Sequence, residues 1–123
     1  MRKPIQCVED LDAFRKAYEL SLELHAESLN WPRHEQMNGL ANQVRRASKG
    51  ICANLAEGFG KQAYSKAEFK RYLAMAIGSS DEIRVWLSYA RDLAYMPPEK
   101  ANQYRTRYQT IAKMLSGLHK NWS

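Results

Sequence analysis

The chain has few of the residues that mark secreted, membrane-spanning or metal-binding proteins. It holds two cysteines among 123 residues. No close motif pairs Cys7 with Cys52, and the first residues, MRKPIQCVEDLD, lack the apolar core of a secretory signal. No run of about 18 apolar residues occurs, so no transmembrane helix is expected. We therefore expect a reduced, cytoplasmic protein.

Patterns typical of catalysis are also scarce. His25, His34 and His119 lie far apart and form no ligand pair with either cysteine, which predicts no metal site. The serines of GSSDE (78–82) have no histidine or lysine base at a recognisable spacing. GFGK (58–61) follows a helical pattern and lacks the glycine spacing of a phosphate-binding loop. We expect no enzyme, no metal and no cofactor.

Negative charge is scarce in two stretches of the chain. The formal net charge is +6, and residues 45–71 hold seven bases against two acids. Residues 97–123 hold five bases against one acid, whereas the first thirty residues hold four bases and six acids. This asymmetry favours an anionic partner on one side of the molecule, with nucleic acid first and an anionic membrane second. A basic surface that is merely solvated is the alternative.

Four segments repeat the helical period and none alternates at period two, which predicts an all-α fold. The short connections favour a single domain over residues 1–123, built as an antiparallel up-down four-helix bundle. The expected helices span residues 10–30, 35–57, 65–95 and 98–120.

The apolar spacing predicts which side of each helix faces the core. In the first helix the main stripe is Leu11, Phe14, Tyr18, Leu22 and Leu29, widened by Ala13, Ala17, Leu20 and Leu24. In the second the inward residues are Met37, Leu40, Val44, Ala47, Ile51 and Leu55, with Gly58 or Gly60 as the stop.

The later two helices carry clear boundary signals. SKAE (65–68) is a capping box that starts the third helix, whose inward residues are Phe69, Leu73, Ala76, Ile77, Ile83, Leu87, Ala90 and Leu93 or Ala94. Pro98 fits the first turn of the fourth. There the narrow seam is Ala101, Tyr104, Tyr108, Ile111, Leu115, Leu118 and Trp122.

One edge of the second helix carries Arg46, Gly50, Ala53 and Glu57, which predicts a packing seam. If the helix ends at Glu57, this carboxylate meets the negative end of the helix dipole and needs a positive partner. Arg45 or Arg46, from the same chain or a neighbouring copy, is the expected partner. A catalytic role for Glu57 lacks a second carboxylate or nucleophile nearby.

Another edge of this helix carries Arg45 and Lys49 with no acid beside them, which favours contacts to phosphate. For the cluster that continues toward Arg71, phosphate contact and a solvated surface are equally supported. The predicted nucleic-acid-binding residues are Arg45, Lys49, Lys61, Lys66, Lys70, Arg71, Arg105 and Lys113.

Aromatic residues are plentiful by contrast. Trp86 lies beside the stripe of the third helix and Tyr89 lies off it, so aromatic surface should remain exposed once one bundle is closed. Such surface favours association with another protein surface. Stacking of these aromatic rings on exposed nucleic-acid bases is the more specific alternative.

QVRRASKGICANLAEGFGK (43–61) and YLAMAIGSSDEIRVWLSYARDLAYM (72–96) closely resemble the proteins encoded within intervening sequences of bacterial 23S ribosomal RNA genes. The resemblance covers nearly the whole chain. It implies a four-helix bundle assembled as a homopentameric ring, with a basic surface or channel that engages nucleic acid. Related proteins include the accessory variability determinants of diversity-generating retroelements, which work beside a reverse transcriptase.

The residues that match the family's motif are expected to serve structure or an interface. They are Gln43, Arg46, Asn54, Glu57, Gly58, Gly78, Ser79 and Glu82, with Arg45 also in the motif. Gly78 and Ser79 are small enough to permit close helix contact. The chain departs from the family at Ser80 and Asp81, where a more apolar first residue is common.

The sequence therefore predicts a non-enzymatic, oligomeric nucleic-acid-binding protein that contacts phosphates of RNA or DNA with little sequence specificity. An adaptor that docks a protein partner, such as a reverse transcriptase, is the alternative.

Overall fold

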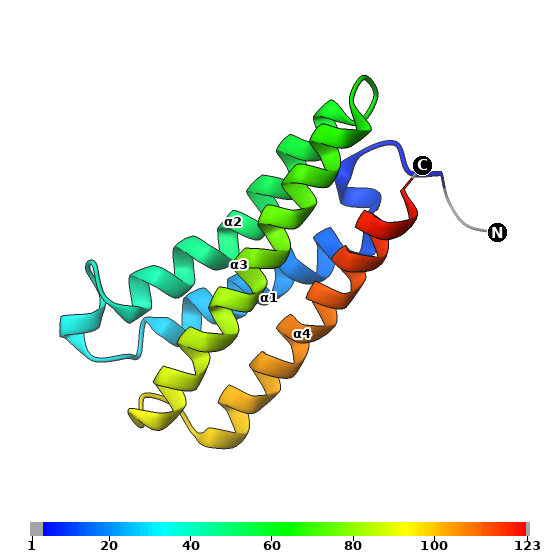
Figure 1. The fold of residues 1–123 in the computed structure, drawn as a ribbon. Helices are drawn as coiled ribbons and strands as arrows, with labels where there is room; N and C mark the ends of the chain where they lie inside the picture. The colour runs from blue at the N-terminus through cyan, green and yellow to red at the C-terminus, as the bar shows by residue number, and fades with distance from the viewer. Residues whose placement is uncertain (1–3, 123) are drawn as a thin grey trace.

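The computed structural model describes residues 4–122, which fold into four long helices and two short 3₁₀ turns (Figure 1). The elements are η1 (Val8–Asp10), α1 (Asp12–Ser28), η2 (Arg33–Glu35), α2 (Leu40–Lys61), α3 (Lys66–Asp92) and α4 (Pro98–Asn121). No strand occurs within these residues, and the all-α prediction is confirmed. None of their helices combines the length and apolar character that a membrane span requires.

The helices run antiparallel to one another along the chain. Helix α3 lies between α2 and α4, and α1 packs mainly against α2 (Figure 1). The turn between α2 and α3 lies at the same end of the bundle as the start of α1 and the end of α4, and the other two connections lie at the opposite end (Figure 1). Bases near residues 61–71 are therefore separated along α2 from those near residue 45.

The core is filled by aliphatic and aromatic side chains from all four helices. Four buried serines interrupt it, namely Ser21, Ser28, Ser48 and Ser80. Each hydroxyl donates to a carbonyl three or four residues earlier in its own helix, at 2.6–3.2 Å. A buried hydroxyl without such a bond would be destabilising, so these small side chains permit close helix packing without an unsatisfied donor.

The predicted main stripe of α1 is wrong over most of its length. Tyr18, Leu22 and Leu29 are 52%, 55% and 58% exposed. The buried side is the one that had been expected only to widen the stripe, and it consists of Ala13, Ala17, Leu20 and Leu24. Helix α1 carries two adjacent apolar stripes, and the one with small residues lies against the other helices.

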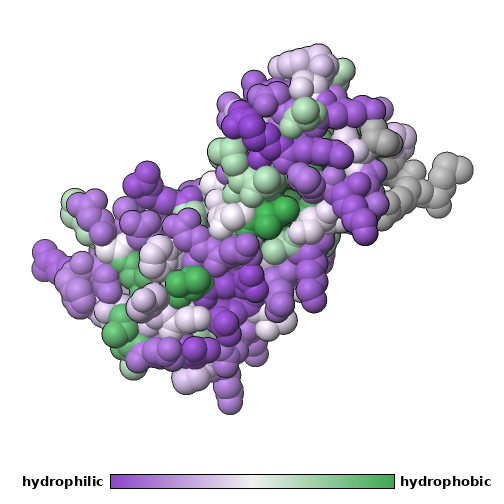
Figure 2. All heavy atoms as spheres, in the orientation of Figure 1, coloured by the Kyte–Doolittle hydropathy of each residue, from purple (hydrophilic) through white to green (hydrophobic). Residues whose placement is uncertain are grey.

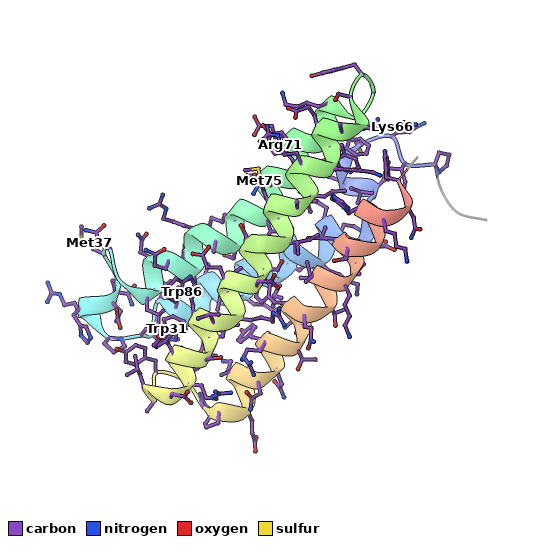
Figure 3. The ribbon with its side chains drawn as sticks, in the orientation of Figure 1. Trp31, Met37, Lys66, Arg71, Met75 and Trp86 are labelled. Atoms are coloured by element: carbon purple, nitrogen blue, oxygen red, sulfur yellow. The ribbon has the colours of Figure 1, made fainter. Side chains whose placement is uncertain are left out.

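Helix α2 is shifted toward its C-terminus relative to the prediction. It begins at Leu40, because residues 36–39 form turns in which Asn38 takes a φ of 60°. Met37, expected in the core, is 82% exposed and projects from this connection (Figure 3). The helix continues through both glycines to Lys61, so neither Gly58 nor Gly60 is its stop.

Close packing against α3 explains the glycine at position 58. Gly58 is buried, and a Cβ atom there would stand 2.5 Å from Cβ of Tyr72 and 3.2 Å from Cδ1 of Phe69. Both neighbours belong to α3. The missing side chain therefore allows the last turns of α2 to approach the first turns of α3.

The boundaries of α3 and α4 are closer to expectation. The Ser65 hydroxyl accepts from the amide of Glu68 at 3.2 Å, as the capping pattern predicts, but the Glu68 carboxylate pairs with Arg71. Helix α3 ends at Asp92, and Ala94 follows with a φ of 63°.

Pro98 occupies the first turn of α4. The predicted seam of α4 is buried from Ala101 to Leu115, and its last two residues, Leu118 and Trp122, are partly buried.

A carboxylate ties together the two connections at the far end of the bundle. One oxygen of Glu35 accepts from the Leu40 amide at 2.9 Å, and the other accepts from the Tyr95 hydroxyl at 2.7 Å. These two bonds, the backbone bond first, hold the pKa of Glu35 below its usual value. The same contact raises the pKa of Tyr95. The carboxylate thus satisfies the first turn of α2 and fastens it to the turn before α4.

Ion pairs join α1 to α4 near this end. Arg107 donates to both oxygens of Glu23, at 2.5 and 2.9 Å, and Lys100 pairs with Glu27 at 2.7 Å. The hydrogen bond from Arg107 is the main reason that the pKa of Glu23 is lowered. Glu23 and Glu27 of α1 therefore face α4, and both are paired with its bases.

Candidate nucleic-acid interface

Arg45, the first of the predicted phosphate contacts, serves as a tether between elements. Its Nε donates to the Ser28 hydroxyl at 2.7 Å, and its guanidinium also contacts the Ser28 carbonyl at 3.4 Å and the side-chain oxygen of Gln36. It thereby joins α2 to the end of α1 and to the connection between them. All of these acceptors are uncharged, so the positive charge of Arg45 is not neutralised by them.

Lys49 lies one turn further along α2 and contacts a histidine of α1. Its Nζ stands 2.8 Å from Nδ1 of His25 on α1. An ammonium can only donate, so Nδ1 must accept, and the proton of the neutral ring is assigned to Nε2. Burial, followed by the charges of Lys49 and Arg45, lowers the pKa of His25. Histidine and lysine are 24 residues apart, and no sequence spacing predicts this contact.

A second group of predicted residues surrounds the turn between α2 and α3. Arg71 is bound to Glu68, at 3.0 Å, and its guanidinium also stacks 4.7 Å from the ring centre of Tyr72. Lys66 lies on the other side of the same helix (Figure 3). Arg71 is the main reason that the pKa of Glu68 is lowered, and the charge of Lys61 contributes to this shift. These bases share one end of the bundle but face different directions.

The two predicted residues of α4 are dissimilar. Arg105 is partly buried, and its Nε lacks a hydrogen-bond partner among residues 4–122. It contributes, after Arg91, to lowering the pKa of Asp92 at the end of α3. Lys113 is exposed. The eight predicted contacts are therefore spread over the edge of α2 beside α1, the turn between α2 and α3, and α4.

The expected pairing of Glu57 with Arg45 or Arg46 of the same chain is wrong for the described residues, and a partner from a neighbouring copy stays a prediction. Glu57 is exposed and forms no hydrogen bond or ion pair with residues 4–122. The helix runs one further turn to Lys61, which removes Glu57 from the negative end of the dipole. Arg45, one expected partner, contacts Ser28 instead, and Arg46 is exposed.

Some of the remaining motif residues pack between helices, and others lie on the surface. A Cβ at Gly50 would stand 3.9 Å from the Ser79 hydroxyl, so these two residues face each other between α2 and α3. Glu82 accepts from the indole nitrogen of Trp86 at 3.1 Å. Gly78 is exposed, and a Cβ there would meet no atom within 4 Å, so it makes no close helix contact within the described chain. Gln43 and Asn54 are partly buried on α2.

Helix α3 and Leu93, the residue that follows it, leave apolar side chains on the surface. Met75, Val85, Tyr89 and Leu93 are 44–54% exposed, and Trp86 is partly exposed beside them. Hydrophobic patches lie between hydrophilic ones on the face of the molecule that α3 crosses (Figure 2). The exposure of Tyr89 agrees with the prediction that aromatic surface remains.

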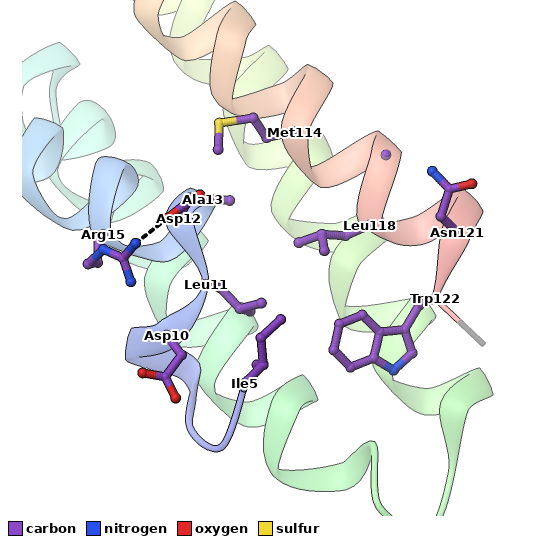
Figure 4. Close-up of a pocket in the computed structure, with 11 residues that line it drawn as sticks. Ile5, Asp10, Leu11, Asp12, Ala13, Arg15, Met114, Leu118, Asn121 and Trp122 are labelled. Carbon is purple, nitrogen blue, oxygen red and sulfur yellow. Dashed lines mark hydrogen bonds and ion pairs between the residues drawn. The ribbon is translucent and has the colours of Figure 1, made fainter. Parts of the chain in front are cut away.

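A groove of about 860 Å³ opens between the start of α1 and the end of α4. Leu118 and Trp122 point across it toward Leu11 and Ile5 (Figure 4). The Asp12 carboxylate at its rim is bound to Arg15. Among residues 4–122, no group of three or more metal-ligating side chains occurs in this groove or elsewhere.

Comparison with known proteins places the chain in a family. Residues 9–117 match the family model described as 23S rRNA-intervening sequence protein. The chain belongs to this family. A crystal structure from Bacteroides thetaiotaomicron, of a protein with unknown function from the S23 ribosomal protein family, matches with a TM-score of 0.78. It is 22% identical and covers 89% of this chain and 96% of its own, which shows that the two share a fold. No curated protein matches the chain.

Proposed function

We propose that this member of the family is a non-enzymatic protein that binds nucleic acid through phosphate contacts with little sequence preference. The observation that carries the proposal is that most of the predicted bases form no ion pair. Of the eight predicted residues, Arg71 is bound to a carboxylate, and the other seven form no ion pair within residues 4–122. Phosphates bound there would release condensed counterions, which drives sequence-independent binding.

The contacts have unequal roles in this proposal. Lys49 is exposed and lies beside Arg45 and His25, so it is the first candidate to meet a phosphate. Lys61, Lys66, Lys70 and Lys113 extend the basic surface. Arg45 is partly buried and anchored to Ser28, and Arg105 is also partly buried, so both are less accessible than Lys49. The family's description refers to an rRNA intervening sequence, which agrees with a nucleic-acid context.

We also propose that the protein assembles as a homo-oligomer, with the pentameric ring that the family resemblance implies. The exposed apolar residues of α3, Met75, Val85 and Tyr89, support such an interface, because large exposed apolar patches are rare on monomers. The exposed edge of Arg46, Ala53 and Glu57 on the neighbouring helix would then face another copy.

A second candidate function rests on the same apolar surface. A protein partner such as a polymerase could occupy the side of α3 that carries Met75, Val85 and Tyr89, which would make the protein an assembly adaptor. Binding through this surface should tolerate salt, whereas phosphate contacts weaken steeply as salt rises.

The test is binding of labelled structured RNA and duplex DNA across a salt series, with the mass of the protein in solution measured alongside. We expect Lys49→Ala and Lys61→Ala each to reduce the slope of log K against log salt by about one. Lys16→Ala is the matched control, because Lys16 is an exposed lysine on α1 outside the predicted set. Absence of binding at low salt, or an equal change in the control, would refute the phosphate surface.

A further inference from the structure

Three basic side chains meet where the end of α1 lies against α2. Lys49 contacts Nδ1 of His25 at 2.8 Å, and Arg45 is held one turn away by its 2.7 Å bond to Ser28. The Ser28 hydroxyl itself donates to the backbone carbonyl of His25 at 2.7 Å. The cluster is thus built from both helices and its members are fixed relative to one another.

No carboxylate of the described chain neutralises this cluster. The acids of α1 closest in sequence, Glu23 and Glu27, pair with Arg107 and Lys100 of α4 on another side of the helix. The charges that act on His25 come from Lys49 and Arg45 of α2. The connection before α2 contributes Gln36, which is uncharged and accepts from Arg45.

This arrangement keeps His25 neutral when the site is empty. Its ring accepts from Lys49, and a proton on Nδ1 would remove that bond and place a third cation beside two others. The lowered pKa of His25 agrees with this geometry. A bound phosphate group would instead favour the protonated form of His25, because its negative charge would attract all three side chains. The position of His25 in the last turn of α1 also favours its charged form, since the carbonyl end of a helix attracts cations.

We propose that His25, Arg45 and Lys49 form a phosphate-binding site in which phosphate binding is coupled to uptake of one proton by His25. The inference rests on the proposed function and adds a residue and a pH dependence to it. On binding, the Lys49 ammonium turns from Nδ1 to a phosphate oxygen, and a solvent proton adds to Nδ1. His25 can then donate to the phosphate, while Arg45 stays anchored to Ser28. No covalent bond forms or breaks except the N–H bond of this protonation.

Coupling between two ligands is reciprocal, so a phosphate that favours protonated His25 must bind more tightly as pH falls. Each unit by which binding raises the pKa of His25 corresponds to a tenfold gain in affinity at low pH. For a partly exposed site we expect a gain of about 3- to 10-fold between about pH 8 and pH 6. Phosphodiester groups do not titrate in this interval, so an RNA probe reports the protein's proton alone.

The experiment is an NMR titration of the three histidines in the full chain, free and with an oligouridylate probe. We expect the pKa of His25 to rise by roughly half a unit or more on binding, with His34 and His119 as internal controls. In His25→Gln the ratio of affinities at about pH 6 and pH 8 should fall to near one. His119→Gln should keep the ratio, because His119 lies in a hollow between α3 and α4. Circular dichroism verifies that both variants fold.

The outcomes separate this inference from the proposed function. Salt-dependent RNA binding with an unmoved pKa of His25, or with an unchanged pH ratio in His25→Gln, would overturn the inference and leave the proposed function intact. If RNA does not bind, inorganic phosphate is the second probe. A raised pKa of His25 in phosphate would then support a site for free phosphate, and an unmoved pKa would overturn the site itself.

Discussion

Replacing Glu35 by alanine should destabilise the protein, because this carboxylate joins two connections of the bundle. The carboxylate accepts from the Leu40 amide at 2.9 Å and from the Tyr95 hydroxyl at 2.7 Å. Hydrogen bonds to charged groups contribute about 1.5–3 kcal/mol each, and substitution of a residue that caps a helix costs about 1 kcal/mol. Allowing for partial replacement by water, we expect Glu35→Ala to lower the free energy of unfolding by about 2–4 kcal/mol.

The assay is urea unfolding followed by far-UV circular dichroism and by tryptophan fluorescence. Trp31 is buried and its ring lies 6.1 Å from that of Tyr95, so its emission reports on this end of the bundle. The matched control is Glu19→Ala, which removes an exposed carboxylate of α1 and should change stability by less than about 0.5 kcal/mol.

A double-mutant cycle isolates the bond between the two connections. Tyr95→Phe removes the hydroxyl alone and should cost about 1 kcal/mol, and its coupling with Glu35→Ala should be about 1 kcal/mol. Additive effects of the two substitutions would refute the bond. A loss below about 0.5 kcal/mol in Glu35→Ala would refute the whole argument.

The pH dependence of this contribution has a definite sign. The pKa of Glu35 is lowered in the folded protein, so its contribution is present above the pKa of the unfolded chain, near 4.3. It is lost as pH falls through the lower, folded value. The stability difference between the natural protein and Glu35→Ala should therefore shrink in acid.

Three further predictions follow from single positions. Gly58→Ala should lower the free energy of unfolding in urea by about 1–3 kcal/mol, because the new Cβ would stand 2.5 Å from Cβ of Tyr72. Unchanged stability would show that α2 and α3 can move apart at little cost. Burial raises the pKa of the Cys52 thiol to about 11. At about pH 8 a thiol reagent should therefore modify the exposed Cys7 much faster than Cys52 in the folded protein, and equal rates at the two cysteines would contradict this. Glu57→Ala should leave the stability of a single copy within about 0.5 kcal/mol, so a change in solution mass would instead show that this edge contacts another copy.

The helices could be predicted from the sequence because their signals are local. The seam of α4 was correctly predicted from Ala101 to Leu115, because this helix carries one narrow apolar stripe. The hydroxyl cap at Ser65 and the proline at the start of α4 were also correct. Each of these signals depends on the backbone of one segment and on residues within a few positions of it.

The inward side of α1 could not be predicted in the same way. Its two apolar stripes are adjacent. The exposed stripe contains the large side chains of Tyr18 and Leu22, and their size favoured the wrong stripe as the buried one. The choice between them depends on how closely other helices approach, which favours the small Ala13 and Ala17. The end of α2 was misplaced for a related reason, since Gly58 reflects contact with α3 and does not stop the helix.

The candidate site also combines features that the sequence predicts with contacts that only the fold creates. The sequence by itself determined where helices form and which stretches carry unbalanced positive charge, because both follow from residue type and local spacing. Only the tertiary structure brought His25 to Lys49, across 24 residues, and Glu35 to Tyr95, across 60. Contacts between helices depend on which side each helix turns toward its neighbour and on its position along that neighbour. A repeating pattern within one helix specifies neither of these.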